Sequence, residues 1–186
     1  MSEFSYQNYS DAINWVATMH DGQYRKGTQI PYLAHVYGVA FSLVSAGIED
    51  KDTIIAALLH DTVEDTEVTI NMINELFGEK VAEYVDALSE DKAKSWEDRK
   101  RYAINHTNHL PLGAKWIKLA DKVNSLEMMA TEVKNGMMDW NKFNRGFLHQ
   151  KWYYSRILLE LGKEQIIMTS KLYQHANELL EVRSEE

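Results

Sequence analysis

The sequence predicts an all-α fold of about eight to ten helices, and three observations support this. Apolar residues recur at three- and four-residue spacing along most of the 186 residues. No stretch of useful length alternates apolar and polar residues as a half-buried strand does. Leu, Ala, Met, Glu and Lys, which favour helix, are plentiful, and there are only two prolines. We therefore expect a single helical bundle over residues 1–186.

Composition narrows the function classes. The net charge of −8 argues against broad nucleic-acid binding, which needs a basic face. No apolar run approaches the ~20 residues that span a bilayer, so we expect no membrane partner. The chain has no cysteine, which excludes disulfides and fits a reducing compartment, so we expect a cytoplasmic location. A homo-oligomer is left open.

The first predicted helix begins at Ser10 or Asp11, either of which can cap it, and ends near Gly22. Residues 23–29, QYRKGTQ, then form a basic loop. A few clustered basic residues of this kind can hold a small phosphorylated ligand even in an acidic protein.

The second helix has Pro31 in its first turn, where a missing N–H costs nothing, and it stops at Gly47. The third begins at Asp50 or Asp52 and carries the segment LLHDTVEDT, residues 58–66. We expect this segment to organise the functional site, because it places four ionisable groups next to an apolar run.

Helical spacing continues through the rest of the chain, with Asn135-Gly136 as a turn signal. No internal repeat or linker separates a second domain. The remaining predicted helices cover about 69–77, 79–89, a restart near Ser95, 112–127, and the last third through Leu180.

Within LLHDTVEDT, His60 and Asp61 are metal-type ligands, and Glu64 and Asp65 follow one turn later. On a continuous helix His60 would lie above Glu64, and Asp61 above Asp65. Buried charges are costly unless they are paired or bound to metal. A solvated acidic helix end is the simpler alternative.

His35 and Asp121 lie in two other apolar helices, and with His60-Asp61 they suggest a mononuclear metal site. Two imidazoles and two carboxylates suit Mn²⁺, Fe²⁺ or Zn²⁺ in an open site. A lone buried His is more often a hydrogen-bonded core residue, so spacing alone leaves both interpretations open.

The motifs together resemble the HD-domain metal-dependent phosphohydrolases, and within them the RelA/SpoT-type (p)ppGpp hydrolase domain and the small alarmone hydrolases. Three stretches carry the resemblance. They are HDGQYRKGTQIPYLAH at 20–35, HDTVEDT at 60–66 and WIKLADKVNSL at 116–126. The resemblance implies a single HD-type hydrolase domain, usually with Mn²⁺. Its reaction would release pyrophosphate from ppGpp or pppGpp, by attack of a metal-bound water on the 3′-pyrophosphate.

Carried over by position, the resemblance implies a set of roles for individual residues. Glu64 and Asp65 would be catalytic, with Glu64 the better candidate for positioning the nucleophile. The metal ligands would be His35, His60, Asp61 and Asp121.

The small phosphorylated nucleotide would meet Arg25 and Lys26, where the family has its basic pair. Lys100 lies in a second basic cluster that can meet another phosphate. Asn124 and Ser125 can hydrogen-bond a ribose.

The position four residues after Asp121 departs from the family, which has Asn there, whereas this chain has Ser125. Two alternatives therefore stay open: an HD-domain nucleotidase or NADPH 2′-phosphatase, and a non-catalytic nucleotide-binding sensor. Because all ligand and carboxylate positions are filled, the sequence argues against the sensor.

Overall fold

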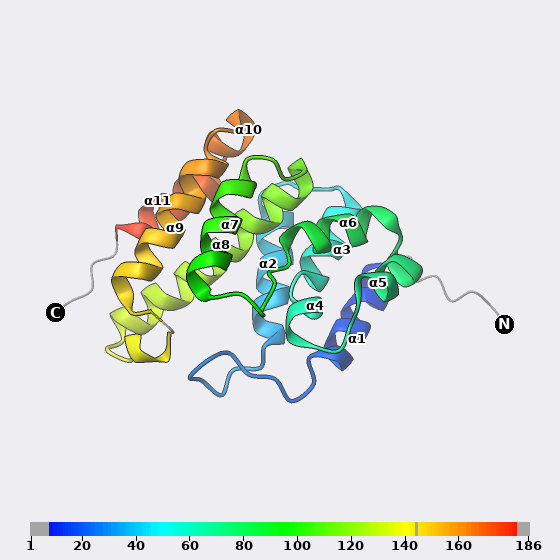
Figure 1. Cartoon of the computed structure of the whole chain (residues 1–186), viewed down its shortest axis with the longest axis horizontal. Helices are drawn as coiled ribbons and strands as arrows, with labels where there is room; N and C mark the ends of the chain where they lie inside the picture. The colour runs from blue at the N-terminus through cyan, green and yellow to red at the C-terminus, as the bar shows by residue number, and fades with distance from the viewer. Residues whose placement is uncertain (1–7, 144, 182–186) are drawn as a thin grey trace.

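The computed structural model describes residues 8–143 and 145–181, and its regular elements within them are all helical (Figure 1). Eleven α-helical segments lie in these ranges, of which two are single turns of four residues, so nine longer helices match the predicted eight to ten. The all-α prediction is confirmed. The segments are α1 (Tyr9–Met19), α2 (Leu33–Ser45), α3 (Lys51–Leu59), α4 (Thr62–Asp65), α5 (Ile70–Phe77), α6 (Glu79–Leu88), α7 (Trp96–Thr107), α8 (Leu112–Lys134), the 3₁₀ helix η1 (Trp140–Lys142), α9 (Phe147–Leu161), α10 (Gln165–Met168) and α11 (Lys171–Leu180).

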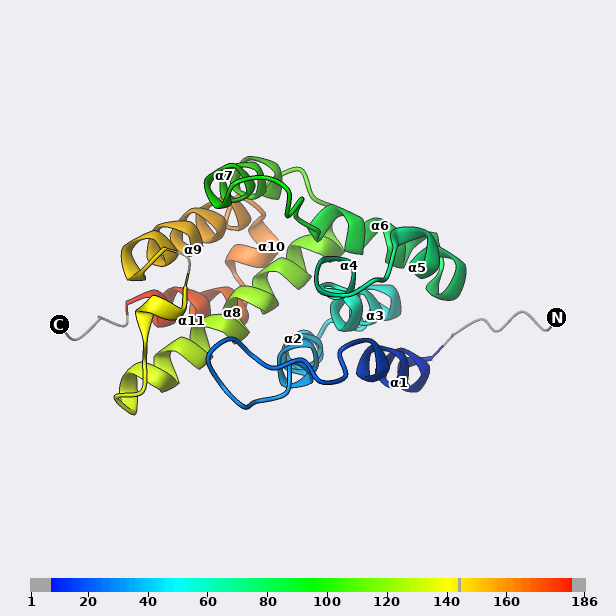
Figure 2. The same cartoon turned by 60° about the horizontal axis from the view of Figure 1, so that its bottom comes forward.

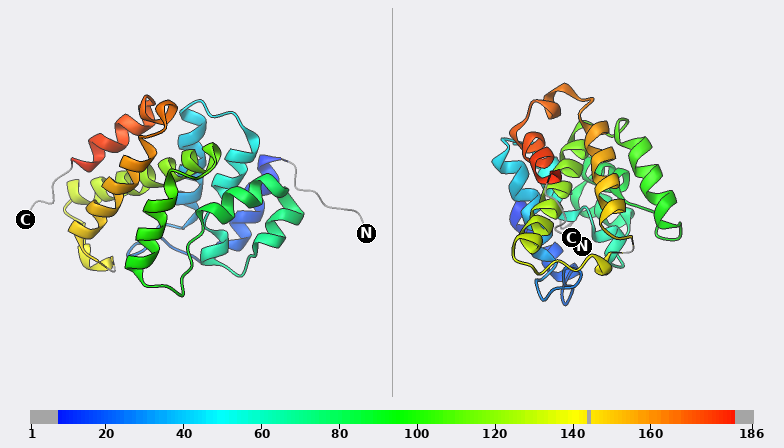
Figure 3. Two further views of the ribbon diagram at one scale, coloured as in Figure 1. Left: turned by 45° about the horizontal axis from the view of Figure 1, so that its top comes forward. Right: turned by 90° about the vertical axis from the view of Figure 1, so that its left-hand side faces the viewer.

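The longest helix, α8, is the axis of the bundle. It continues past the predicted end near residue 127, because nothing interrupts it before Asn135-Gly136. Every residue from Gly113 to Ala120 is buried, so neighbours must cover this half of the helix from all sides. α2, α3 and α6 contact α8 on one side and α9 and α11 on the other (Figures 1 and 2). α7 packs on α9 at the outside (Figure 3). No described helix is long and apolar enough to cross a membrane.

Helix starts follow the side-chain caps. Asp50 and Ser95 cap α3 and α7, as predicted. The predicted cap of the first helix, Ser10 or Asp11, is wrong. Asn8 is the cap, because its Oδ1 accepts a hydrogen bond from the backbone N–H of Asp11 at 2.9 Å.

The second helix begins two residues later than predicted, and Pro31 lies outside it. Pro31 instead forms a bridge with Tyr24, and the Arg25 N–H donates to the Ile30 carbonyl at 2.8 Å. The basic loop is thus closed on itself, with Gly27 at φ +74° near its tip, a conformation that favours glycine. This closure fixes the backbone of Arg25 in front of α2.

The LLHDTVEDT segment is not one helix. α3 ends at Leu59, His60 and Asp61 form a break, and α4 starts at Thr62. The Thr62 hydroxyl donates to the Leu59 carbonyl at 2.7 Å, so a side chain takes an acceptor that a continuing helix would use. The prediction of one continuous helix face for the four ionisable residues is therefore wrong.

Candidate metal centre and its cavity

Four side chains from α2, the α3–α4 break and α8 converge in the core. His35 Nε2 lies 3.4 Å from Asp121 Oδ1 and 3.5 Å from Asp61 Oδ2, while His60 Nε2 lies 3.1 Å from Asp61 Oδ2. One ligand atom each from His35, His60 and Asp121 lie within 4.8 Å of one another. The four predicted ligands are thus brought together, although 86 residues separate the first from the last in sequence.

In both imidazoles the Nδ1 atom hydrogen-bonds to an oxygen acceptor. His60 Nδ1 lies 2.8 Å from the Ala57 carbonyl, and His35 Nδ1 lies 2.7 Å from Asn124 Oδ1. An acceptor at Nδ1 requires a proton there, which leaves each Nε2 to face the carboxylates, as a donor when protonated and as a metal ligand when not. The buried His60 Nε2 lies 3.1 Å from Asp61 Oδ2 but makes no hydrogen bond of acceptable geometry to the described residues. Orientation of a ligand His through its second nitrogen is the usual support of metal-binding imidazoles, so the residues fit a cation.

The electrostatics also favour a positive charge at the centre. Burial alone would lower the pKa of His35, but hydrogen bonds to Asp121 and Asp61 raise this pKa to about 9. Burial works against ionisation of Asp121, yet Lys122 and the two imidazoles hold its pKa far below the ordinary value. The carboxylates therefore stay ionised and attract either protons or a metal ion to the Nε2 atoms.

Two residues that the sequence prediction omitted hold the ligand carboxylates. The Tyr32 hydroxyl donates to Asp61 Oδ2 at 2.5 Å, and Lys122 Nζ donates to Asp121 Oδ2 at 2.6 Å. Burial and the charge of Asp61 raise the pKa of Tyr32, which keeps the phenol protonated as a donor. A sequence signal existed for both, because Tyr32 follows Pro31 in the first motif and Lys122 adjoins the ligand Asp.

The two predicted catalytic carboxylates are separated. Glu64 lines the cavity at the centre, and its Oε1 accepts a hydrogen bond from the Glu90 N–H at 2.8 Å. Burial, then repulsion by Asp61, raises the pKa of Glu64 to about 7. Asp65 is not among the cavity-lining residues, and its carboxylate pairs with Lys92. The geometry thus favours Glu64 for chemistry, and the catalytic role of Asp65 stays a prediction.

A cavity of about 260 Å³ opens onto the centre. Its lining combines charged residues with methionine and aromatic side chains. Its charged and polar lining includes Arg25, Lys26, Tyr32, Glu64, Glu90, Arg99, Lys100, Lys118, Lys122 and Ser125. Its apolar and aromatic lining includes Leu88, Ile117, Met128, Met129, Phe143, Tyr153 and Tyr154.

Of the predicted substrate-binding residues, Arg25, Lys26, Lys100 and Ser125 line this cavity, whereas Asn124 does not. Asn124 Oδ1 accepts from Arg25 Nη1 at 2.9 Å as well as from His35. Its contacts are therefore those of a residue that orients a ligand His and a basic side chain. A ribose contact for Asn124 stays a prediction.

The second basic cluster is organised by an acidic residue that the sequence did not single out. Glu90 accepts from Lys100 Nζ at 2.7 Å and from Arg99 Nη1 at 2.9 Å. The same residue holds Glu64 through its backbone. Glu90 thus links the cationic wall to the carboxylate beside the metal centre.

Comparison with known proteins gives three related findings. A family model described as HD domain matches residues 12–140. A guanosine-3′,5′-bis(diphosphate) 3′-pyrophosphohydrolase, MESH1, of Danio rerio is 40% identical over 118 residues, or 62% of this chain and 66% of the relative, just under two thirds. MESH1 of Drosophila melanogaster is 35% identical over 138 residues, or 73% and 77% of the two chains.

A solved structure described as a metazoan ortholog of SpoT that hydrolyses ppGpp superposes with a TM-score of 0.77 at 28% identity. It covers 91% of this chain and 92% of that chain. A Listeria monocytogenes protein, lmo0812, gives 0.71 at 31% identity over 78% and 96% of the two chains.

Proposed function

Since this chain belongs to the HD-domain family, we propose that it is a metal-dependent guanosine-3′,5′-bis(diphosphate) 3′-pyrophosphohydrolase. It would convert ppGpp and water to GDP and pyrophosphate, and pppGpp to GTP and pyrophosphate. The names and identities of the MESH1 relatives support this substrate. The observation that carries the proposal is one cavity that joins the His–Asp centre, Glu64 and a wall of cations.

We propose Mn²⁺ as the resident ion, with Fe²⁺ and Zn²⁺ as alternatives, held by His35, His60, Asp61 and Asp121. Oxygen and imidazole ligands without a thiolate support this choice. When bound, such an ion activates water and polarises a phosphoryl oxygen.

Glu64 is the group that this chain offers for proton transfer. Burial holds its pKa above the ordinary value, which makes the carboxylate a better proton acceptor for the attacking water. The water oxygen adds to the phosphorus attached to the ribose 3′ oxygen, and the bond between that phosphorus and the ribose oxygen breaks. The proton that Glu64 accepts from the water is then available to the ribose oxygen, so that Glu64 returns to its ionised form. The Glu90 N–H keeps Glu64 oriented during this exchange. We assign Asp65 a positioning role, since its backbone carbonyl accepts from Gln23 Nε2 at 2.7 Å and its carboxylate is paired with Lys92.

The order of residues along α8 gives the nucleotide a direction. Lys118 and Asp121 lie beside the centre, and Met128 and Met129 line the same cavity two to three turns further on. A rise of about 1.5 Å per residue separates Lys118 from Met129 by roughly 16 Å, which is enough for a nucleotide. We place the pyrophosphate beside the centre and the nucleoside toward the methionines, with Arg25, Lys26 and Lys100 as phosphate ligands.

A nucleotidase or NADPH 2′-phosphatase is the second candidate, and Ser125 favours it. The Ser125 hydroxyl lies 3.5 Å from Asp121 Oδ1 and is shorter than the Asn of the family. A non-catalytic sensor is disfavoured, since Glu64 and all four ligand positions are filled.

The proposed function is tested by supplying the Mn²⁺-loaded protein with ppGpp, pppGpp, NADPH and deoxynucleoside monophosphates and separating products by ion exchange. Pyrophosphate released from ppGpp supports the proposal. Orthophosphate as the sole product, from NADPH or a mononucleotide, would assign the second candidate instead.

We further propose that residues 1–186 act as one HD-type domain. α9 and α11, beyond the family match, pack on α8, the helix that carries Asp121. A cytoplasmic location is supported by the absence of cysteine. A homo-oligomer stays a prediction.

A further inference from the structure

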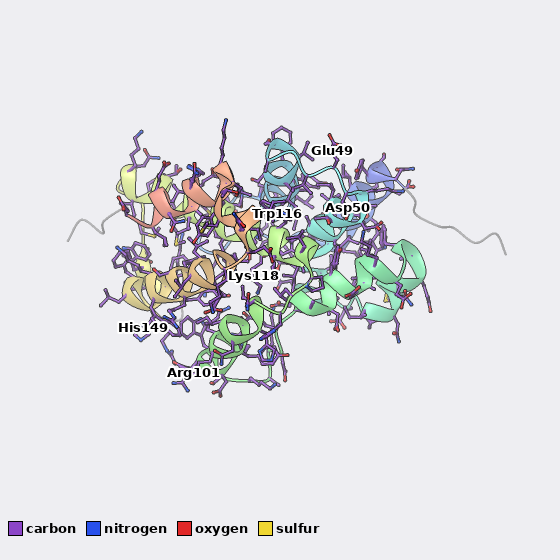
Figure 4. The ribbon with its side chains drawn as sticks, turned by 90° about the horizontal axis from the view of Figure 1, so that it is seen from above. Glu49, Asp50, Arg101, Trp116, Lys118 and His149 are labelled. Atoms are coloured by element: carbon purple, nitrogen blue, oxygen red, sulfur yellow. The ribbon has the colours of Figure 1, made fainter. Side chains whose placement is uncertain are left out.

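Lys118 is a buried lysine that faces the cavity. Lys118 lies on α8, is 7% exposed and lines the same cavity as Glu64 and Asp121. Figure 4 labels it near the middle of the molecule, whereas Arg101 lies at the periphery. A charge in this position must be compensated by an acceptor, because an unpaired buried charge is destabilising.

No described residue supplies that acceptor, and this sets Lys118 apart from Lys115 and Lys122 on the same helix. Lys115 Nζ donates to Glu164 at 3.0 Å, and Lys122 Nζ donates to Asp121 at 2.6 Å. Lys118 makes no hydrogen bond or ion pair with any residue in the described ranges. Its ammonium group is therefore available to a ligand in the cavity.

The surroundings of Lys118 select an anion. Its charged neighbours are the cations Lys100 and Lys122 and the carboxylates Asp121 and Glu90, and all four line the same cavity. Both carboxylates already accept hydrogen bonds from other lysines, Asp121 from Lys122 and Glu90 from Lys100. Burial, followed by repulsion from Lys122, lowers the pKa of Lys118 to about 8, so that the group is still mainly protonated at neutral pH. Lys118 precedes Asp121 by three residues on α8, which places both on one helix face and next to the reacting bond.

We propose that Lys118 binds a phosphate of the departing pyrophosphate, as a binding residue of the active site. This inference rests on the proposed function for the identity of the leaving group. The Lys118 ammonium meets the negative charge that accumulates on the pyrophosphate as the bond to the ribose oxygen breaks. The group is kept without a protein acceptor so that substrate provides one, at a cost in stability of the free protein.

The test uses inorganic pyrophosphate and chelator-treated protein, so that neither turnover nor chelation of the ion by pyrophosphate intervenes. Binding is measured by calorimetry for wild type, Lys118→Met and Lys118→Gln. Lys115→Met is the matched control, since it removes another buried lysine of α8 whose partner is Glu164 and not the cavity. We expect wild type and Lys115→Met to bind alike, and both Lys118 variants to bind roughly tenfold to a hundredfold more weakly.

Thermal unfolding gives a second readout that a purely structural lysine would not produce. Lys118→Met should raise the unfolding temperature while weakening pyrophosphate binding, because it removes a buried charge that has no hydrogen-bonded acceptor among the described residues. Unchanged affinity in both Lys118 variants, or no binding by wild type into the millimolar range, would overturn the inference. Failure of ppGpp hydrolysis by wild type, with pyrophosphate binding still lost in both variants, would instead refute the proposed function and leave the anion site standing.

Discussion

Gly38, on α2, lies against Asn124, the residue that hydrogen-bonds to His35 in the centre. A Cβ added to Gly38 would lie well inside the van der Waals radius of Asn124 Nδ2 and 3.2 Å from its Cγ. To restore an ordinary contact of 3.4 Å or more, the amide must retreat by roughly 1 Å. Its 2.7 Å bond from His35 would then stretch beyond the range of a hydrogen bond.

Gly38→Ala should therefore weaken Mn²⁺ binding by about 10- to 100-fold, the usual cost of losing the partner that orients a ligand His. The Gly-to-Ala exchange also stabilises the helix by about 0.8–1 kcal/mol, which offsets the strain. The free energy of unfolding of the metal-free protein should therefore fall by less than the free energy of Mn²⁺ binding does. Calorimetric titration of chelator-treated protein with Mn²⁺ measures the first effect, and urea unfolding of the same samples measures the second.

A double-mutant cycle with Asn124→Ala separates this mechanism from a general distortion of α2. Once the amide is truncated, the added methyl at position 38 meets open space, and Gly38→Ala should have little further effect on Mn²⁺ affinity. The reasoning is refuted by wild-type affinity in Gly38→Ala, or by losses from the two substitutions that simply add.

Three further predictions follow from the site. Glu64→Gln should lower kcat for ppGpp turnover by about 10²–10⁴-fold while Mn²⁺ affinity changes little. Asp65→Asn should lower kcat by a smaller factor. Equal losses of kcat would contradict the ranking of the two carboxylates. Tyr32→Phe removes the hydroxyl that donates to Asp61 and should weaken Mn²⁺ binding about tenfold. Tyr37→Phe is the control, since the Tyr37 hydroxyl donates to the Ile13 carbonyl at 3.4 Å. Equal Mn²⁺ affinity in the two variants would refute the role assigned to Tyr32. The pKa of Lys118 is about 8 in the folded protein and about 10.4 in the unfolded chain, so the wild type gains stability as pH rises between these values. The excess stability of Lys118→Met at pH 7, measured by urea unfolding, should therefore shrink toward pH 10. A gap that stays constant with pH would show that Lys118 does not titrate in this way.

The sequence was sufficient for the fold class, and the four side chains that it singles out as candidate ligands do converge. His35 and Asp121 could be chosen before their contact was known, since each is a ligand-type residue between apolar neighbours in a predicted helix. The start at Ser95 was predicted as one residue, whereas the third helix had two candidates, Asp50 and Asp52, of which Asp50 is the cap. At the first helix, Asn8, Ser10 and Asp11 all have capping side chains, and only the backbone geometry decides among them.

What the sequence could not supply were orientations that depend on long-range packing. Asp65 follows Glu64 directly, yet one carboxylate enters the cavity and the other meets Lys92. Glu90 has no motif of its own in the sequence, and only the fold places it against Lys100. Lys118 carried no signal, because a lysine in an apolar helix is noticed only when its lack of an acceptor is known.

The break at His60 and Asp61 has a consequence for the local stability of the protein. α4 has only four residues, too few for a helix to persist by its own hydrogen bonds. Its order comes from elsewhere in the chain, through Gln23 at the Asp65 carbonyl and the Glu90 N–H at Glu64. The amides of α4 should therefore exchange at a lower free energy than those of the long helix α8, and occupation of the centre through the adjoining His60 and Asp61 should protect them.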